Sequence, residues 1–379
     1  METPVIYFYT DVPRSVNVRV GFPEGLVTEF YPPVRSQQPK FDSKVAYREG
    51  EPVGGGAIDW GQVDLLPPSL FRPALSDASL SDVIAETMIA RMLPNSSAFP
   101  HYAHARNTDS ALVHVRLGHQ AAKAAAAVPT ESHLERFLFY RGVGKFRLPY
   151  QVRYDQHEEG VWVNDSDEAL PPALLIQIEG EHSRMALLGA TAPHSTTSLP
   201  ELAEVERDEI AKKVQQLLED ADLFPKEAAA MVDTWKDSWF TEEGTRVLYF
   251  VPRPLVDQLL PLTIEPAPEK AVRVLVGRLE LMSPTMEAKM RDLVRLNIKA
   301  RAEHSRHVEL AREAGKDTSV PFALPAAITS LGRFAEPAIA RVIATTADRD
   351  VENEARVLLR EIRSRNIALD ADSQASAQN

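Results

Sequence analysis

The first half of the chain shows the alternation of apolar and polar positions that is typical of half-buried β-strands. Val16, Val18 and Val20 alternate with polar neighbours, so one face of this strand is expected to be buried. Further strands are predicted at 57–66, 111–117, 134–141, 149–154, 161–164, 174–179 and 184–189. Apart from a short helix expected at 81–93 and capped by Ser81, turns rather than helices separate these strands. Residues 1–195 are therefore predicted to form an antiparallel β-sandwich-like region.

After residue 195 the apolar positions recur mainly at helical spacing. Ser198 and Glu201 have the spacing of a capping box and predict a helix start, and Pro225 is expected to begin a second helix. With strands expected at 246–251 and 271–281, residues 196–283 are predicted to form a small mixed α/β segment.

Amphipathic helical spacing then continues from 284 to 366 and predicts a helical segment. The polar residues 367–379, which are rich in Ala, Ser and Gln, are expected to form a disordered tail. The fold class predicted from these patterns is a multidomain α+β protein.

Composition narrows the function classes. The chain has 379 residues, 44% of them hydrophobic, which is enough for two or three domains with buried cores. Its net charge of −12 and the lack of a basic stripe argue against a nucleic-acid partner. The sequence has no cysteine, which excludes a thiol nucleophile, disulfides and Cys-ligated metal. No apolar run reaches the roughly 20 residues of a membrane span, so none is expected in this chain.

Two parts of the sequence carry a resemblance. The opening Thr3-Pro-Val-Ile-Tyr-Phe-Tyr9 resembles uncharacterised bacterial proteins whose first strand reads PVIYFY or KPVIYLYP. The resemblance extends through the segments 16–25, 137–146, 234–240 and 260–264. It implies a β-sandwich-like N-terminal region and an extracytoplasmic location in the periplasm or cell envelope. Because those relatives usually begin further upstream, it also implies that an export signal is missing from this chain. It brings no activity, so catalytic residues stay unknown.

The second resemblance lies in the helical segment. Residues 331–340 followed by 348–360 are similar to one HEAT-like helical repeat. A lone repeat cannot close its own core and must pack on neighbouring helices. This similarity suggests a protein-interaction scaffold as one function, with a protein partner bound through the helical segment.

The densest group of chemistry-bearing residues is HYAHARNTDS, residues 101–110. His101 and His104 offer two imidazoles to a divalent metal such as zinc, with Asp109 as a carboxylate ligand. A catalytic zinc site needs a third protein ligand, which would come from elsewhere, for example His114. The alternative is a solvated loop without a cofactor, in which Thr108 and Asp109 make turn hydrogen bonds.

Binding residues can be proposed in the same region. Tyr102, Arg106, Asp109 and Arg141 are the candidates, with Arg106 as the anchor because its guanidinium fork can hold a carboxylate or phosphate in two parallel bonds. We expect His101, Tyr102, Arg106 and Asp109 to be at least partly exposed near the rim of the β-region. The leading hypothesis is a binding or structural module for a glycan or an anionic small molecule. A metal-dependent hydrolase of glycans or esters at this loop is the alternative.

Overall fold

The computed structural model describes residues 5–40, 54–94, 102–117, 131–144, 146–155, 157, 159–319 and 321–378. It contains both helices and antiparallel sheets, so the protein is of mixed α+β class, as the sequence predicts. None of its helices is both long and apolar enough to cross a membrane, within the part of the chain that is described.

Most strands of the first half pair into one six-stranded sheet and one three-stranded sheet. The six-stranded sheet has the order β16-β2-β5-β6-β7, and β4 also pairs with β5. Its strands are β2 (Arg14–Phe22), β4 (Ser36–Gln38), β5 (Gly56–Leu66), β6 (Leu112–Leu117), β7 (Glu131–Glu135) and β16 (Leu262–Glu265). The three-stranded sheet consists of β1 (Val5–Ile6), β8 (Leu138–Gly144) and β3 (Gly25–Tyr31), in the order β1-β8-β3.

The other strands build a five-stranded sheet and a second three-stranded sheet. The five-stranded sheet has the order β14-β12-β11-β15-β17, with β11 (Ala173–Glu179), β12 (His182–Leu188), β14 (Ala203–Glu204), β15 (Gly244–Val251) and β17 (Leu275–Leu281). The small sheet joins β9 (Tyr150–Tyr154), β10 (Gly160–Asn164) and β13 (Ser195–Ser198). Strand pairing crosses residue 195 in both larger sheets, because β11 pairs with β15 and β2 pairs with β16.

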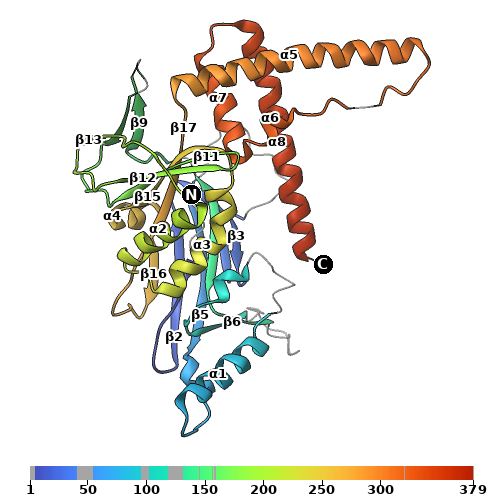
Figure 1. The fold of residues 1–379 in the computed structure, drawn as a ribbon. Helices are drawn as coiled ribbons and strands as arrows, with labels where there is room; N and C mark the ends of the chain where they lie inside the picture. Colours follow the sequence, from blue (N-terminus) through green and yellow to red (C-terminus); the bar gives the residue numbers. More distant parts are fainter. Residues whose placement is uncertain are drawn as a thin grey trace.

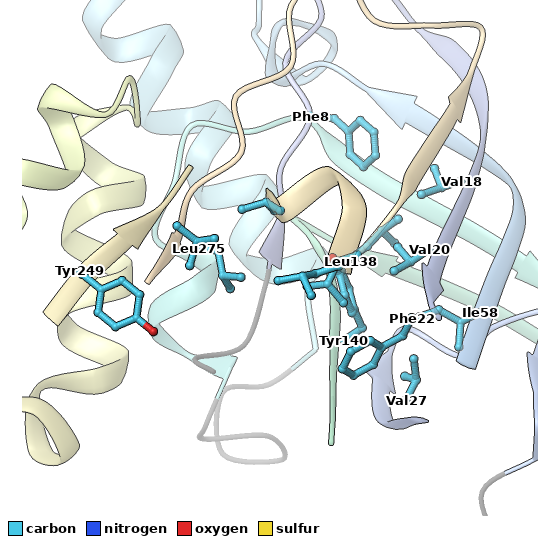
Figure 2. Packing of buried hydrophobic residues seen from close by; sticks show 14 of the residues in the cluster. Phe8, Val18, Val20, Phe22, Val27, Ile58, Leu138, Tyr140, Tyr249 and Leu275 are labelled. Atoms are coloured by element: carbon cyan, nitrogen blue, oxygen red, sulfur yellow. The ribbon is translucent and has the colours of Figure 1, made fainter. Parts of the chain in front are cut away.

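Alternating side chains bury the core between the sheets. Val16, Val18 and Val20 are buried while Asn17 and Arg19 are exposed, as the pattern predicts. In Figure 2 residues of β2 and β5 lie in the same cluster as Tyr249 of β15 and Leu275 of β17. The main core therefore joins the six-stranded sheet to the five-stranded one.

Helices cover the other face of the five-stranded sheet. These are α2 (Arg207–Asp220) and α3 (Pro225–Phe240), and Figure 1 shows the two side by side. Ile176 and Leu248 of the sheet pack there against Val214 and Trp239. A short helix, α4 (Arg253–Leu259), leads into β16 and was not predicted.

The C-terminal helices form their own core beyond the sheets (Figure 1). They are α5 (Pro284–Glu313), α6 (Ala326–Thr329), the 3-10 turn η4 (Gly332–Phe334), α7 (Ala335–Thr345) and α8 (Arg349–Gln378). The backbone of α8 continues to Gln378, so the disordered tail expected at 367–379 is helical up to that residue. Extending a helix that has already formed requires no new nucleus, and the tail is rich in alanine.

Two helix starts differ from the sequence expectation. The first helix, α1, spans Ala78–Met92 and is capped by Asp77, whose side chain accepts from the Leu80 N–H, and not by Ser81. Ser198 ends β13 instead of opening a helix, because its segment pairs with β10. The helix starts only at Arg207.

Candidate functional site

The loop that carries the candidate residues lies between α1, α3 and the strands β7 and β8. Its short 3-10 turn η3 (His104–Arg106) contacts α3. The main chain on either side is fixed by Tyr7, whose hydroxyl donates to the Ala105 carbonyl at 3.0 Å, and by Ala111, whose N–H donates to the Phe8 carbonyl. The first residues of the protein therefore hold this loop in place.

Tyr102 belongs to the core and not to an exposed rim. Its ring stacks on Tyr31 with centroids 4.9 Å apart and also packs against Phe137 and Phe139. Its hydroxyl donates to Glu29 Oε1 at 3.0 Å, and burial, followed by the charge of Glu29, raises the pKa of the phenol. The expected exposure of Tyr102 is wrong because the aromatic cluster offers its ring a larger apolar contact than the solvent-facing rim does.

Arg141 is connected to Tyr102 through the same carboxylate. Its Nε lies 2.6 Å from Glu29 Oε2, so Glu29 joins two of the four binding candidates. Arg141 is half exposed. The contact between Arg141 and Glu29 belongs to the β3–β8 pairing, where Glu29 lies opposite Arg141. This arrangement is a cross-strand ion pair. Together with the Tyr102 hydroxyl, it gives each oxygen of the Glu29 carboxylate a partner.

Arg106 is buried against Glu135, at the end of β7. Its Nε and Nη2 lie 2.9 and 2.8 Å from Glu135 Oε2, and the Glu135 side chain has no exposed surface. The fork that we expected to hold a ligand is therefore occupied by a carboxylate of the protein. Nη1 is buried without a well-formed hydrogen bond among the described residues. The Tyr31 hydroxyl lies near this charge: burial and Glu135 raise its pKa to about 12, and Arg106 opposes that rise.

The neighbouring residue, Arg136, ties the loop to α1. Its Nη1 donates to the Ser110 carbonyl at 3.0 Å and its Nη2 to Glu86 Oε2 at 2.5 Å. The side chain is only 3% exposed. Sequence reasoning missed this residue, because 134–141 was expected to be one continuous strand. The structure breaks that strand at Arg136 and Phe137, between β7 and β8. Two adjacent charges, Glu135 and Arg136, within an apolar run were the available signal.

A cleft opens between α1 and this loop. Its volume is about 520 Å³, within the range of small-molecule sites. Its lining combines three arginines with apolar side chains from α1 and the loop: Glu86, Ile89, Ala90, Arg91, Leu93, Pro94, Ala103, Arg106, Asn107 and Arg136. Arg91 differs from the other two arginines because it is exposed and has no hydrogen bond or ion pair within the described residues.

The remaining candidates from the loop point to α3. Asp109 is exposed, with Lys226 Nζ 2.6 Å from its Oδ1. His104 Nδ1 lies 3.9 Å from Asp233 Oδ2, and both side chains are about half exposed.

Of the other candidate metal ligands, His101 lies outside the described residues. His114 contacts Ser132 at 2.6 Å instead of approaching His104. Within the described part of the chain, no group of three His, Asp or Glu side chains is placed to hold a metal.

Other side chains with catalytic potential have structural partners. The hydroxyl of Ser183 donates to the Val205 carbonyl, and that of Ser195 donates to the Ala192 carbonyl. Trp235 and Trp239 stack with centroids 6.4 Å apart, and Trp239 is fully buried in the core beneath α3. These residues support the fold, and the cleft beside α1 is the strongest candidate site.

Comparison with known proteins adds no assignment. No family model, no curated protein and no solved structure matches the chain.

Proposed function

We propose that the protein is a binding module that holds a small anionic ligand in the cleft between α1 and the 102–107 loop. The observation that carries this proposal is Arg91, an exposed guanidinium at the cleft without a partner among the described residues. An unpaired arginine can give both of its parallel N–H donors to a carboxylate or phosphate, whereas Arg106 has already given its fork to Glu135.

The two buried arginines, Arg106 and Arg136, support this site by joining the segments that surround the cleft. The pairs of Arg106 with Glu135 and of Arg136 with Glu86 connect the loop, β7 and α1. A charged residue buried with its partner is held in a fixed position, since breaking the pair would leave a buried charge without compensation. The cleft is therefore expected to exist before the ligand binds.

The scaffold and the location are part of the same proposal. We infer that the two larger sheets act as the sandwich-like body expected from the sequence, that strands of residues 196–283 are part of this body, and that the helical segment is attached to it. The extracytoplasmic location rests on the resemblance of the opening strand alone. Fractionation of cells that express the protein from its natural gene would test it. The metal-dependent hydrolase has no supporting ligand set within the described residues.

Titration of the isotope-labelled protein with sodium butyrate, followed by NMR, tests the proposed site. Saturable shifts of the backbone signals of residues 86–94 and 103–107 are expected. The exposed pair of Lys226 and Asp109, on the α3 side of the loop, provides an internal reference that should move less. Shifts scattered over the surface, or shifts that do not saturate, would contradict binding in the cleft.

A further inference from the structure

The cleft has a chemical asymmetry that restricts what it can hold. One part of its lining is apolar and consists of Ile89, Ala90, Leu93, Pro94 and Ala103. Three arginines, Arg91, Arg106 and Arg136, line the same cleft. An apolar lining stabilises a bound ligand only through the apolar ligand surface that it removes from water. A bare inorganic anion would leave this part of the cleft unused.

The charges at the cleft limit the charge of the ligand. Three arginines face two carboxylates, since Glu135 binds Arg106 and Glu86 binds Arg136. Among the described residues that line the cleft, the positive charge of Arg91 remains without a partner. A single negative charge on the ligand balances it, whereas a second one would be repelled by Glu86, which also lines the cleft.

We propose that the cleft takes a monocarboxylate with a short apolar chain, its carboxylate on Arg91 and its chain along Ala90 and Leu93. This inference rests on the proposed function, and it adds the ligand class. The volume of about 520 Å³ suits a single small molecule or the end of a chain and not a folded partner. Two sources share this chemistry: a free short-chain acid and the C-terminal carboxylate of a peptide that ends in an apolar residue.

Calorimetric titration of the full protein with butyrate, hexanoate and butyl phosphate tests the ligand class. Each methylene group that enters the cleft contributes about 0.8 kcal/mol, so hexanoate, with two more of them, is expected to bind roughly fifteenfold more tightly than butyrate. Butyl phosphate should bind more weakly than hexanoate at a pH where it carries two charges. Equal affinity for butyrate and hexanoate would overturn the apolar chain, and tighter binding of butyl phosphate would overturn the single charge. Both results would leave anion binding itself intact, whereas no binding of any probe would overturn the proposed function as well.

Two variants and one further ligand sharpen the assignment. Ala90→Leu keeps a strong helix former on α1 and fills space beside the apolar lining. In this variant hexanoate should no longer bind more tightly than butyrate, while butyrate still binds. Ala302→Leu, at an exposed position of α5, is the matched control and should keep the gain. An unchanged gain in Ala90→Leu would contradict the placement of the chain. N-acetyl-leucine, compared with hexanoate, distinguishes the peptide terminus from the free acid by which of the two binds more tightly.

Discussion

Two clusters of arginine and carboxylate groups in the described part of this protein use the same residue types in different ways. The loop cluster consists of Arg106, Glu135, Arg136 and Glu86, beside the cleft. The helix-end cluster consists of Arg246, Arg278, Glu242 and Glu280, at the C-terminal end of α3.

The helix-end cluster is directed at backbone carbonyls. Arg246 Nη1 donates to the carbonyls of Ser238 and Trp239, and its Nη2 donates to those of Glu242 and Glu243 at 2.7 and 2.9 Å. The last carbonyls of a helix have no partner within the helix and carry partial negative charge. The side chain of Arg246 has no exposed surface, so this cluster closes the end of α3 and offers nothing to a ligand.

The loop cluster differs in that one member, Glu86, is half exposed, and it also has a different neighbourhood. Its two pairs are also balanced in charge, yet they line or adjoin a cleft that contains the additional exposed charge of Arg91. A buried ion pair therefore does not by itself mark a functional site. An unpaired charge beside a cavity is the more informative sign, and predictions for the two clusters differ accordingly.

Arg246→Met is expected to have the largest effect on stability. It leaves four buried backbone carbonyls without their donor, and Glu280 keeps only Arg278 as a cationic partner. We expect a loss of about 3 to 5 kcal/mol in the free energy of unfolding. Urea denaturation followed by tryptophan fluorescence measures it. Arg356→Met removes an exposed pair on α8 with Glu352 and should cost less than about 1 kcal/mol. Similar losses in both variants would show that the helix-end cluster has no special role.

Glu135→Gln should weaken the fold less than Arg246→Met does. The amide keeps the shape of the side chain and one acceptor for Arg106, but the buried guanidinium loses its compensating charge. We expect a loss of about 2 to 4 kcal/mol. Glu86→Gln changes the half-exposed partner of Arg136 and should cost less than about 1 kcal/mol. The prediction fails if Glu135→Gln is as stable as the unmodified protein.

Arg106→Lys separates a structural role from a binding role for the residue that the sequence marks as the anchor. Lysine keeps the charge and loses the two-pronged contact with Glu135, so stability should fall by about 1 to 2 kcal/mol. Affinity for butyrate should stay within about twofold, because the cleft keeps its net charge. A large loss of affinity with unchanged stability would return Arg106 to the role of ligand anchor.

Several individual strands and helices could be predicted, because the periodic sequence pattern that indicates them is local. Strands β5, β6, β10 and β11 begin and end within one residue of their expected bounds. Pro225 begins α3 as expected. What the sequence did not predict are pairings between distant segments. Ser198 has the spacing of a capping residue, yet its backbone pairs with β10, which a capping pattern does not encode.

The site was harder to predict than the fold for the same reason. The sequence marks 101–110 as a stretch of dense polar chemistry, but the roles of its residues depend on partners elsewhere in the chain. Arg106 meets Glu135 across 29 residues, and Arg136 meets Glu86 across 50. Arg91 resembles any other surface arginine in the sequence. Only the cleft beside it, formed by α1 and the loop together, distinguishes it.

The affinity of the Arg91→Gln variant for butyrate, measured by calorimetry, tests most directly whether Arg91 binds an anion at the cleft. Arg360→Gln, a change at an exposed arginine on α8, is the control, and the denaturation midpoints of both variants should stay close to that of the unmodified protein. A guanidinium–carboxylate pair that ligand binding shields from water in the cleft contributes about 1.5 to 3 kcal/mol, so Arg91→Gln should lose roughly tenfold or more in affinity while Arg360→Gln loses none. Equal affinity of the two variants would contradict an anion site on Arg91.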